Sequence, residues 1–438
     1  MANTGASVFL DRDLNATQVT ATLRKVAARL LPLLLLAYIA NLLDRNNVGF
    51  AKLTMQADLQ MSDAAFAFGT GMFYFGYLVF EVPSNLILRR AGARLWIARI
   101  MLTWGLVSGA TMFVTGIRSF LCVRILLGVA EAGFFPGVIF YLTLWFPSRE
   151  RTRAVAAFMA ANAIAGIFSN PLSGLIMQHL DQAWGLSGWQ WIFLLESVPS
   201  LIVGVCIYFW LTDRPTEAHW LADDERNWLM GRMRQEEEQR EQRHGADLLR
   251  ALLAPRVWYL ILLYFMIAFC LNAAGLYLPE LIHNHFPNSS KSQIGWLAAV
   301  PSLCGVTGML INGWWSDHTR KYRLHVGLPA FLAAAGWLLA AFAETPAWGL
   351  AGLSLAFLGM MSMLPPFWSL PTSFLSGAAA AGGIALINSV GNVGGLLGPV
   401  TMGLIRDATH SHLYGLFVLA GTLVLGGVLA LFAPHDPS

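Results

Sequence analysis

Six charged side chains lie inside stretches of sequence that are otherwise apolar. They are Asp44, Arg45, Glu81, Arg124, Glu131 and Glu196. A charge at the centre of a helix in hydrocarbon costs at least about 2.5–3.5 kcal/mol on insertion scales, so each should face a partner or a water-filled cavity. Carboxyl and guanidinium groups held together in such a place could bind a proton and an organic anion.

The composition indicates a helical membrane protein. Of the 438 residues, 56% are hydrophobic and only 12% are charged, whereas about a quarter of the residues in a soluble protein are charged. Apolar runs of about 20 residues, long enough to cross a hydrocarbon layer of about 30 Å as helix, recur along almost the whole chain. The runs are continuous, which argues against a β-barrel, whose strands alternate apolar and polar residues. The fold class expected is therefore all-α and membrane-spanning.

Gly, Pro and charged residues divide the apolar sequence into twelve predicted transmembrane helices in two bundles of six. The predicted spans are 29–51, 64–88, 95–115, 118–145, 151–177, 190–211, 256–282, 292–315, 324–343, 347–370, 378–405 and 412–433. The predicted organisation is an N-terminal segment (1–28), a first bundle (29–211), a central loop (212–255), a second bundle (256–433) and a tail (434–438).

The distribution of Lys and Arg predicts the orientation in the membrane. One set of loops carries most of them, including seven arginines in the central loop, while the other set has only Lys52, Arg118, Lys291 and Arg406. Because cytoplasmic loops are enriched in Lys and Arg, we expect both termini and the central loop in the cytoplasm. In that loop "RMRQEEEQREQR" pairs Glu236 with Arg240 at i,i+4 spacing, which favours a surface helix.

The two halves of the chain are weakly similar to each other. A short basic turn follows span 2 ("NLILRRAGAR", 85–94), and another follows span 8 ("GWWSDHTRKYR", 313–323). Span 5 contains "GIFSNPLSGLI" (166–176) and span 11 contains "GLLGPVTMGLI" (395–405). Two related halves of six spans are typical of the major facilitator fold, in which the binding site lies near the middle of the bilayer between the halves.

Four motifs resemble a particular family. "LDRNNVGFA" in span 1, "YFGYLVFEVPSN" in span 2, "RILLGVAEAGFFPGVIFYLTLWFP" in span 4 and "GGIALINSVGNVGGLLGP" in span 11 are similar to the anion:cation symporters of the major facilitator superfamily. The resemblance covers about residues 28–433. It implies transport of a tartrate-type, sugar-acid or aromatic-acid substrate. The span 11 string and "PFWSLPTSFLSG" resemble the tartrate-type bacterial members most.

The depths of the charges in spans 1 and 4 predict which of them meet. At about 1.5 Å per residue, Asp44 lies roughly 22 Å from the inner start of span 1, and Arg124 lies roughly 9 Å from the outer start of span 4. In a layer of about 30 Å these depths nearly coincide, so Asp44 and Arg124 are expected to pair if spans 1 and 4 are neighbours. Glu131 lies two turns beyond Arg124 on the same face.

These groups together predict proton-coupled anion transport. Burial in a low-dielectric cavity favours a neutral carboxyl, whereas an adjacent guanidinium favours a charged one, so a carboxyl balanced between the two can load a proton near neutral pH. Arginine stays charged and matches a carboxylate with two parallel hydrogen bonds. Arg45 points about 100° away from Asp44, which suits it to face the cavity. The other interpretation is a buried ion-pair network that only ties helices together.

Two further carboxyls lie nearer the ends of their spans. Glu81 lies in "EVPSN" of span 2, and Glu196 lies in "LLESVPS" of span 6. For both we favour structural pairing with basic residues at loop ends.

The family resemblance implies the same assignment and adds residues. It makes Asp44 and Glu131 the proton-linked carboxylates, Arg124 the group that balances them, and Arg45 the ligand of the substrate carboxylate. It also implies substrate-binding roles for residues in spans 2, 5, 7, 10 and 11, with Asn392 as a further candidate. The implied residues are Tyr77, Asn162, Tyr264, Trp368 and Asn388. In span 7, Asn272 and Tyr277 are alternatives to Tyr264.

The predicted function is an H⁺-coupled symporter of a small organic anion, such as tartrate or a sugar acid, in the inner (plasma) membrane. Alternatives are an aromatic-carboxylate symporter of the phthalate or hydroxyphenylacetate type, an exchanger or exporter, and a non-transporting receptor or scaffold. An enzyme is not expected, because no HExxH, P-loop or clustered His motif occurs. The four cysteines have no metal-type spacing. We expect no metal, cofactor or nucleic-acid partner, and a monomer.

Overall fold

The computed structural model describes residues 15–242, 254–372 and 377–433, which form helices joined by short connections. Twelve helical segments in these ranges are long and apolar enough to cross a membrane. They begin and end within several residues of the predicted spans, except that the first extends from Thr17 to Asp58. The predicted all-α membrane fold is confirmed, and the first helix is much longer than its apolar run.

The helices of the first half are α1 (Ala16–Asp58), α2 (Asp63–Ala91), α3 (Ala93–Ala110), α4 (Ile117–Glu131), α5 (Phe134–Trp145), α6 (Ser148–Met159), α7 (Ala161–His179) and α8 (Gly188–Trp210). The central stretch contains α9 (Asp223–Gln242). The second half has α11 (Pro255–His285), α12 (Lys291–Thr319), α13 (Tyr322–Ala341), α14 (Pro346–Ser362), α15 (Leu364–Thr372), α16 (Gly377–Gly391), α17 (Val393–Thr409) and α18 (Leu413–Leu431). Three-residue 3₁₀ turns lie at Thr111–Phe113, Ala183–Gly185 and Pro215–Glu217.

Four of the twelve spans are interrupted near their middle, where the sequence predicts continuous helices. The pairs α4/α5, α6/α7, α14/α15 and α16/α17 are each separated by one or two residues. The first interruption is the sharpest, because Gly133 has a φ of 88°, in the left-handed region that favours glycine. Non-helical backbone at membrane depth is tolerated where protein or a cavity satisfies its polar groups. We therefore expect these interruptions to lie beside packed protein or a cavity rather than beside lipid.

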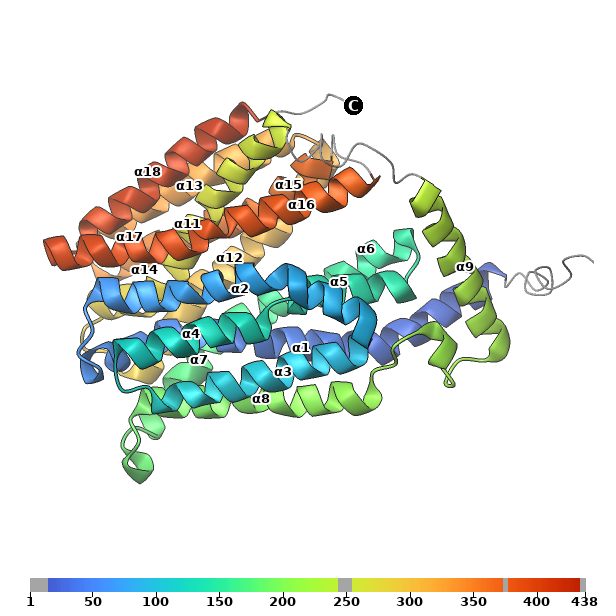
Figure 1. Cartoon of the computed structure of the whole chain (residues 1–438). Coiled ribbons are helices and arrows are strands. Elements are labelled where there is room, and N and C mark those ends of the chain that lie inside the picture. The colour runs from blue at the N-terminus through green and yellow to red at the C-terminus, as the bar shows by residue number, and fades with distance from the viewer. Residues whose placement is uncertain (1–14, 243–253, 373–376, 434–438) are drawn as a thin grey trace, which may run out of the picture.

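The two halves pack against each other mainly through three helix pairs, α7 with α12, α2 with α17, and α1 with α11. In Figure 1 α2 and α17 run side by side along the boundary between the halves. We call the end of the molecule where α1 ends and α2 begins the distal end. At this end α7 and α12 approach so closely that a Cβ on Gly174 would lie 2.7 Å from the carbonyl oxygen of Lys291.

The opposite, proximal end carries α9, which is docked on the first half (Figure 1). Lys25 of α1 bonds to Glu225 of α9 at 2.6 Å, and Trp145 at the end of α5 stacks on Trp220 with a ring-centroid separation of 5.7 Å. Leu229 of α9 is fully buried. The charged central stretch is thus helical, as predicted, and it also contributes to packing.

The interruption at Gly133 gives the first testable prediction. A Cβ at this position would lie 2.8 Å from Cβ of Ser84, whose hydroxyl already accepts a hydrogen bond from Trp96 Nε1 at 3.0 Å. A left-handed conformation costs a non-glycine residue about 1–2 kcal/mol, so Gly133→Ala should lower the melting temperature of the purified protein. Gly421 in α18 is the control, because a Cβ there would meet nothing within 4 Å. Equal melting temperatures for Gly133→Ala and Gly421→Ala would contradict this account.

Candidate functional site

The centre of the candidate site is an ion pair between α1 and the end of α4. Arg45 Nε donates to Glu131 Oε1 at 2.6 Å, and Nη2 of the same guanidinium also contacts that oxygen. Glu131 is the last residue of α4, directly before the interruption at Gly133, and its side chain is 2% exposed. The Arg45 side chain is 33% exposed, so one side of the pair is sealed while the guanidinium remains accessible.

Two aromatic rings of α2 complete the surroundings of Arg45. Its guanidinium carbon lies 5.2 Å from the ring centre of Phe73 and 5.4 Å from that of Tyr77. A cation within about 6 Å of an aromatic face is attracted to it electrostatically. Arg45 is therefore held by a carboxylate and by apolar faces, and it keeps unused N–H donors that could bind a second carboxylate.

Asp44 points away from this pair and lies between α3 and α8. Its carboxylate accepts hydrogen bonds from Trp104 Nε1 at 2.7 Å, Ser108 Oγ at 2.8 Å and Ser200 Oγ at 2.8 Å. The side chain is buried. The donors to Asp44 are neutral, and among the described residues it forms no ion pair. Asp44 is therefore a polar anchor that joins α1 to α3 and α8.

The predicted contact between Asp44 and Arg124 is wrong. Within the described residues Arg124 forms no ion pair, and Nη2 donates only to the backbone oxygen of Thr70 at 3.4 Å. Its guanidinium carbon lies 5.4 Å from the ring centre of Phe73, the ring that Arg45 also faces. The prediction failed because α1 packs against α7, α8 and α11 rather than extensively against α4, and because the donors to the Asp44 carboxylate come from α3 and α8.

The predicted pairing of Glu81 and Glu196 with basic loop ends is also wrong. Glu81 accepts from Ser389 Oγ of α16 at 3.0 Å, a contact that joins the two halves of the chain. Glu196 accepts from Ser173 Oγ of α7 at 2.6 Å, and its second oxygen has no hydrogen-bond partner among the residues that the structure describes. Both carboxyls lie along helix faces that are packed inside the bundle, beyond the reach of the basic loops.

The second half contributes an aromatic and amide cluster. The Tyr264 hydroxyl lies 3.4 Å from Asn388 Oδ1, and the Tyr264 ring packs against Trp368 with a centroid separation of 4.9 Å and against Phe367 at 5.2 Å. Asn392 is the residue that separates α16 from α17. The structure therefore brings Tyr264, Trp368 and Asn388 together, as their proposed common role requires.

The remaining residue predicted for the site, Asn162, lies at the interruption between α6 and α7. Its Nδ2 donates to the Met159 oxygen at 3.1 Å and contacts the Tyr38 hydroxyl at 3.3 Å. Tyr38 belongs to α1, two turns before Arg45, and stacks on Phe158 with a centroid separation of 4.6 Å. Asn162 thus connects a broken span to the helix that carries Arg45.

Three residues of this region were missed in the sequence: Tyr38, Tyr74 and Ser389. Tyr74 of α2 donates from its hydroxyl to Asn272 of α11, across the boundary between the halves. Tyr74 lies one turn before Tyr77, and Ser389 directly follows Asn388. Helical spacing from residues already chosen could have indicated them, but a lone Tyr or Ser in an apolar span carries no signal of its own. Tyr277, the alternative in span 7, lies near Lys52 instead.

Comparison with known proteins identifies the family. The sequence profile of the Major Facilitator Superfamily matches residues 34–399. The chain is 45% identical over 418 residues, 95% of its length and 96% of the relative's, to a protein of Agrobacterium vitis named "Putative tartrate transporter". It is 34% identical to "Inner membrane transport protein RhmT" of Escherichia coli K12, covering 93% of this chain and 94% of that one.

The fold comparison agrees. A bacterial homologue of the human lysosomal transporter Spinster, solved in an inward-facing and unoccupied conformation, matches with a TM-score of 0.76 at 15% identity, over 93% of this chain and 96% of that one. The chain belongs to the Major Facilitator Superfamily. It is a multi-pass membrane transporter of the secondary type rather than an enzyme, as predicted.

The anchoring of Asp44 gives the second prediction. Trp104→Phe removes an indole donor to Asp44. Trp337→Phe makes the same change at an equally buried tryptophan, whose Nε1 has no hydrogen-bond partner in the described part of the chain. Hydrogen bonds to charged groups contribute about 1.5–3 kcal/mol, so Trp104→Phe should lower the melting temperature more than Trp337→Phe does. Equal losses in the two variants would show that the contact with Asp44 adds nothing to stability.

Proposed function

We propose that this chain is a proton-coupled symporter that carries a small organic anion, with tartrate-type dicarboxylates as the first candidates. The observation that carries the proposal is the Arg45–Glu131 contact, in which an accessible guanidinium is bound to a sealed carboxylate. The name of the 45% identical relative favours the tartrate class. The narrower assignment to the anion:cation symporters rests on the motifs in spans 1, 2, 4 and 11.

The proposed mechanism is an exchange of partners at Arg45. A carboxylate of the substrate binds the guanidinium through two parallel hydrogen bonds, and Glu131 gives up its place there. A carboxylate that loses its cation in a sealed site is unstable as an ion, so Glu131 takes up a proton. After the substrate is released on the other side of the membrane, Glu131 releases its proton to that same side and rebinds Arg45. Loading of the anion and loading of the proton are thereby linked.

The other predicted residues fit supporting roles in this scheme. Asp44 would act as a second proton carrier held by neutral donors, and Arg124 would set the local positive potential beside Phe73. Hydroxyl and carboxylate groups of the substrate would be bound by tyrosine and asparagine side chains, and its carbon skeleton by the Trp368 ring. The residues proposed for this contact are Tyr77, Asn162, Tyr264, Trp368 and Asn388.

The proposal also includes the orientation of the chain in the membrane and the way its two bundles move. The proximal end, with the N-terminus of α1 and with α9, is placed in the cytoplasm because the basic loops lie there, and the distal end then faces outward. The chain would act as a monomer in the inner membrane, with the two bundles (29–211 and 256–433) moving against each other around the site. Neither a metal nor a cofactor takes part in this scheme.

An aromatic acid is the second candidate substrate, and one observation favours it. Tyr264, Phe367 and Trp368 form a continuous aromatic cluster, with Phe367 and Trp368 in edge contact at 5.2 Å. A flat aromatic ring could stack on this surface while its carboxylate binds Arg45.

A ligand screen tests the proposed substrate class. Bound ligand raises stability by about RT ln(1 + [L]/Kd), so the purified protein should show a higher melting temperature with tartrate or another hydroxy dicarboxylate than with phthalate or a neutral sugar. In Arg45→Lys the shift should largely disappear, because an ammonium group does not replace a bidentate fork. A shift with aromatic acids alone would select the second candidate, and an unchanged shift in Arg45→Lys would reject the role of Arg45.

The coupling role of Glu131 gives a separate prediction. Glu131→Gln cannot exchange a proton, so uptake driven by a pH gradient in proteoliposomes should be lost, whereas substrate counterflow should remain. Glu81→Gln serves as a control, because Glu81 contacts Ser389 rather than Arg45 and should keep pH-driven uptake. Normal pH-driven uptake by Glu131→Gln would remove Glu131 from the coupling step.

A further inference from the structure

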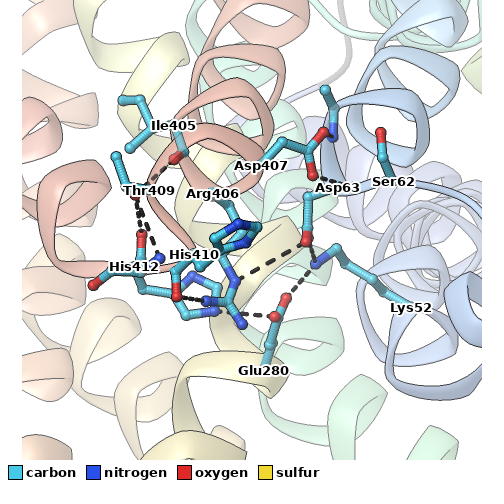
Figure 2. A network of polar contacts seen from close by, with 12 residues as sticks. Lys52, Ser62, Asp63, Glu280, Ile405, Arg406, Asp407, Thr409, His410 and His412 are labelled. Carbon is cyan, nitrogen blue, oxygen red and sulfur yellow. Dashed lines mark hydrogen bonds and ion pairs between the residues drawn. The ribbon is translucent and has the colours of Figure 1, made fainter.

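A second cluster of charges lies at the distal end of the molecule and has no part in the mechanism above. It comprises Lys52 of α1, Asp63 of α2, Glu280 of α11, Arg406 and Asp407 of α17, and His412 just before α18, as Figure 2 shows. We call these six residues the distal cluster. Two of its members belong to the first half of the chain and four to the second.

Lys52 is the centre of the distal cluster. Its ammonium group lies 2.6 Å from Asp63 Oδ1 and also contacts Glu280 of the second half. The Lys52 side chain is 1% exposed, and its nitrogen lies 4.4 Å from the ring centre of Tyr277. A lysine removed so completely from water must keep its counter-ions, so both carboxylates are required while the distal end is closed.

A second contact between the halves uses the start of α2. The two carboxylate oxygens of Asp407 accept from the backbone nitrogens of Asp63 and Ala64, each at 2.9 Å. These N–H groups belong to the first turn of α2, and the N–H groups of a first turn have no acceptors inside their own helix. A carboxylate there is also favoured by the helix dipole. The second half of the chain thus caps a helix of the first half.

Each half also keeps an ion or hydrogen-bond partner of its own. Lys52 and Asp63 both belong to the first half, and Glu280 and His412, which are 3.0 Å apart, both belong to the second. If the halves separate at this end, Lys52 retains Asp63 and Glu280 retains His412. Separation therefore leaves neither Lys52 nor Glu280 alone in an apolar surrounding, which keeps the cluster able to open.

The middle and proximal parts of the boundary are held differently. Within the described residues, the side-chain hydrogen bonds that join the halves there are Tyr74 to Asn272 and Ser389 to Glu81. Neither is an ion pair. Among the described residues, the ion pairs identified between the halves lie at the distal end.

We propose that the distal cluster is the reversible lock that holds the distal end closed, with the Lys52–Glu280 contact and the Asp407 cap on α2 as its two fastenings. In the orientation proposed above the lock faces outward, so it must open before an external anion can reach Arg45. The proposal rests on the proposed transport function for its purpose, but the lock itself is defined by contacts in the substrate-free protein.

The test measures the distance between the distal ends of the two halves by double electron–electron resonance spectroscopy, in full-length, substrate-free protein. Spin labels are attached to cysteines introduced at Ala57 and Asn288, which are exposed at the distal ends of the first and second halves. The natural cysteines, Cys122, Cys206, Cys270 and Cys304, are replaced first, and the background is kept only if it melts like the parent.

Lys52→Met is expected to shift the distance distribution toward longer separations. It removes the buried cation that Asp63 and Glu280 share, so that, among the described residues, Asp63 keeps only Arg406, at 4.0 Å, and Glu280 keeps only His412. The ratio of long to short distances should rise about tenfold or more, the scale expected when one partner of a buried pair is removed. Adding Glu280→Gln to Lys52→Met removes the carboxylate that has lost Lys52 and should bring back part of the short-distance population. Asp407→Asn should act in the same direction as Lys52→Met, because it replaces one acceptor of the cap by a donor.

Lys291→Met is the matched control. Lys291 of α12 forms an ion pair with Asp181 of the first half at 3.2 Å, also between the halves and at the distal end, but the side chains are 28% and 39% exposed. Exposed pairs contribute little, so the same substitution there should leave the distances unchanged. The proposal is overturned if Lys52→Met and Asp407→Asn keep the parent distribution, or if Lys291→Met shifts it as far. If Lys52→Met does not fold, Glu280→Gln alone and Asp407→Asn decide the question.

The outcome is independent of the substrate. If no organic anion stabilises the protein but Lys52→Met lengthens the distances, the proposed substrate class fails and the lock stands. If an anion binds at Arg45 but Lys52→Met and Asp407→Asn leave the distances unchanged, the proposed lock fails and the proposed function stands.

Discussion

One contact organises the interior of this transporter, the ion pair of Arg45 and Glu131. Arg45 comes from a helix that runs the whole length of the molecule, and Glu131 ends a helix that stops inside it. Because a charge inside an apolar bundle is stable only with a partner, neither group can be uncovered without a substitute. An organic anion can replace Glu131 at Arg45, and a proton can replace Arg45 at Glu131. In our account this double replacement is what links the two cargoes.

The contacts around the pair fix the elements that carry it. Asp44 ties α1 to α3 and α8 through three neutral donors, which fixes the helix that carries Arg45. The interruption at Gly133 ends α4 at Glu131, so the carboxylate sits at a helix end rather than on a lipid-facing turn. At the distal end the Lys52–Glu280 contact and the Asp407 cap join the halves over the site. In our proposal, the charges around Arg45 bind the substrate and the proton, and the separable charges at the distal end control access to them.

The sequence was sufficient for the fold because twelve long apolar runs leave few alternatives in a bilayer. The same reasoning singled out five of the six charged residues that are buried in the described part of the chain, but it assigned the sixth, Lys52, to a loop. The sequence was insufficient to predict which side chains these charged groups contact. Depth along a helix does not say which way a side chain points, so Asp44 was matched with Arg124, whereas its donors come from α3 and α8. Ser173 and Ser389, the partners of Glu196 and Glu81, are ordinary residues in helical sequence. The Gly133 interruption required a φ that no spacing rule reveals.

The central claim is that an anion takes the place of Glu131 at Arg45 and that Glu131 then takes up a proton. The most direct measurement is the number of protons absorbed when ligand binds, obtained by calorimetry of the purified protein in buffers that differ in their enthalpy of ionisation. The account predicts net proton uptake on binding of the organic anion by the parent protein, and loss of that uptake in Glu131→Gln with binding retained. Binding by the parent protein without proton uptake at any pH between about 5 and 8, the range in which such coupling must act, would contradict it.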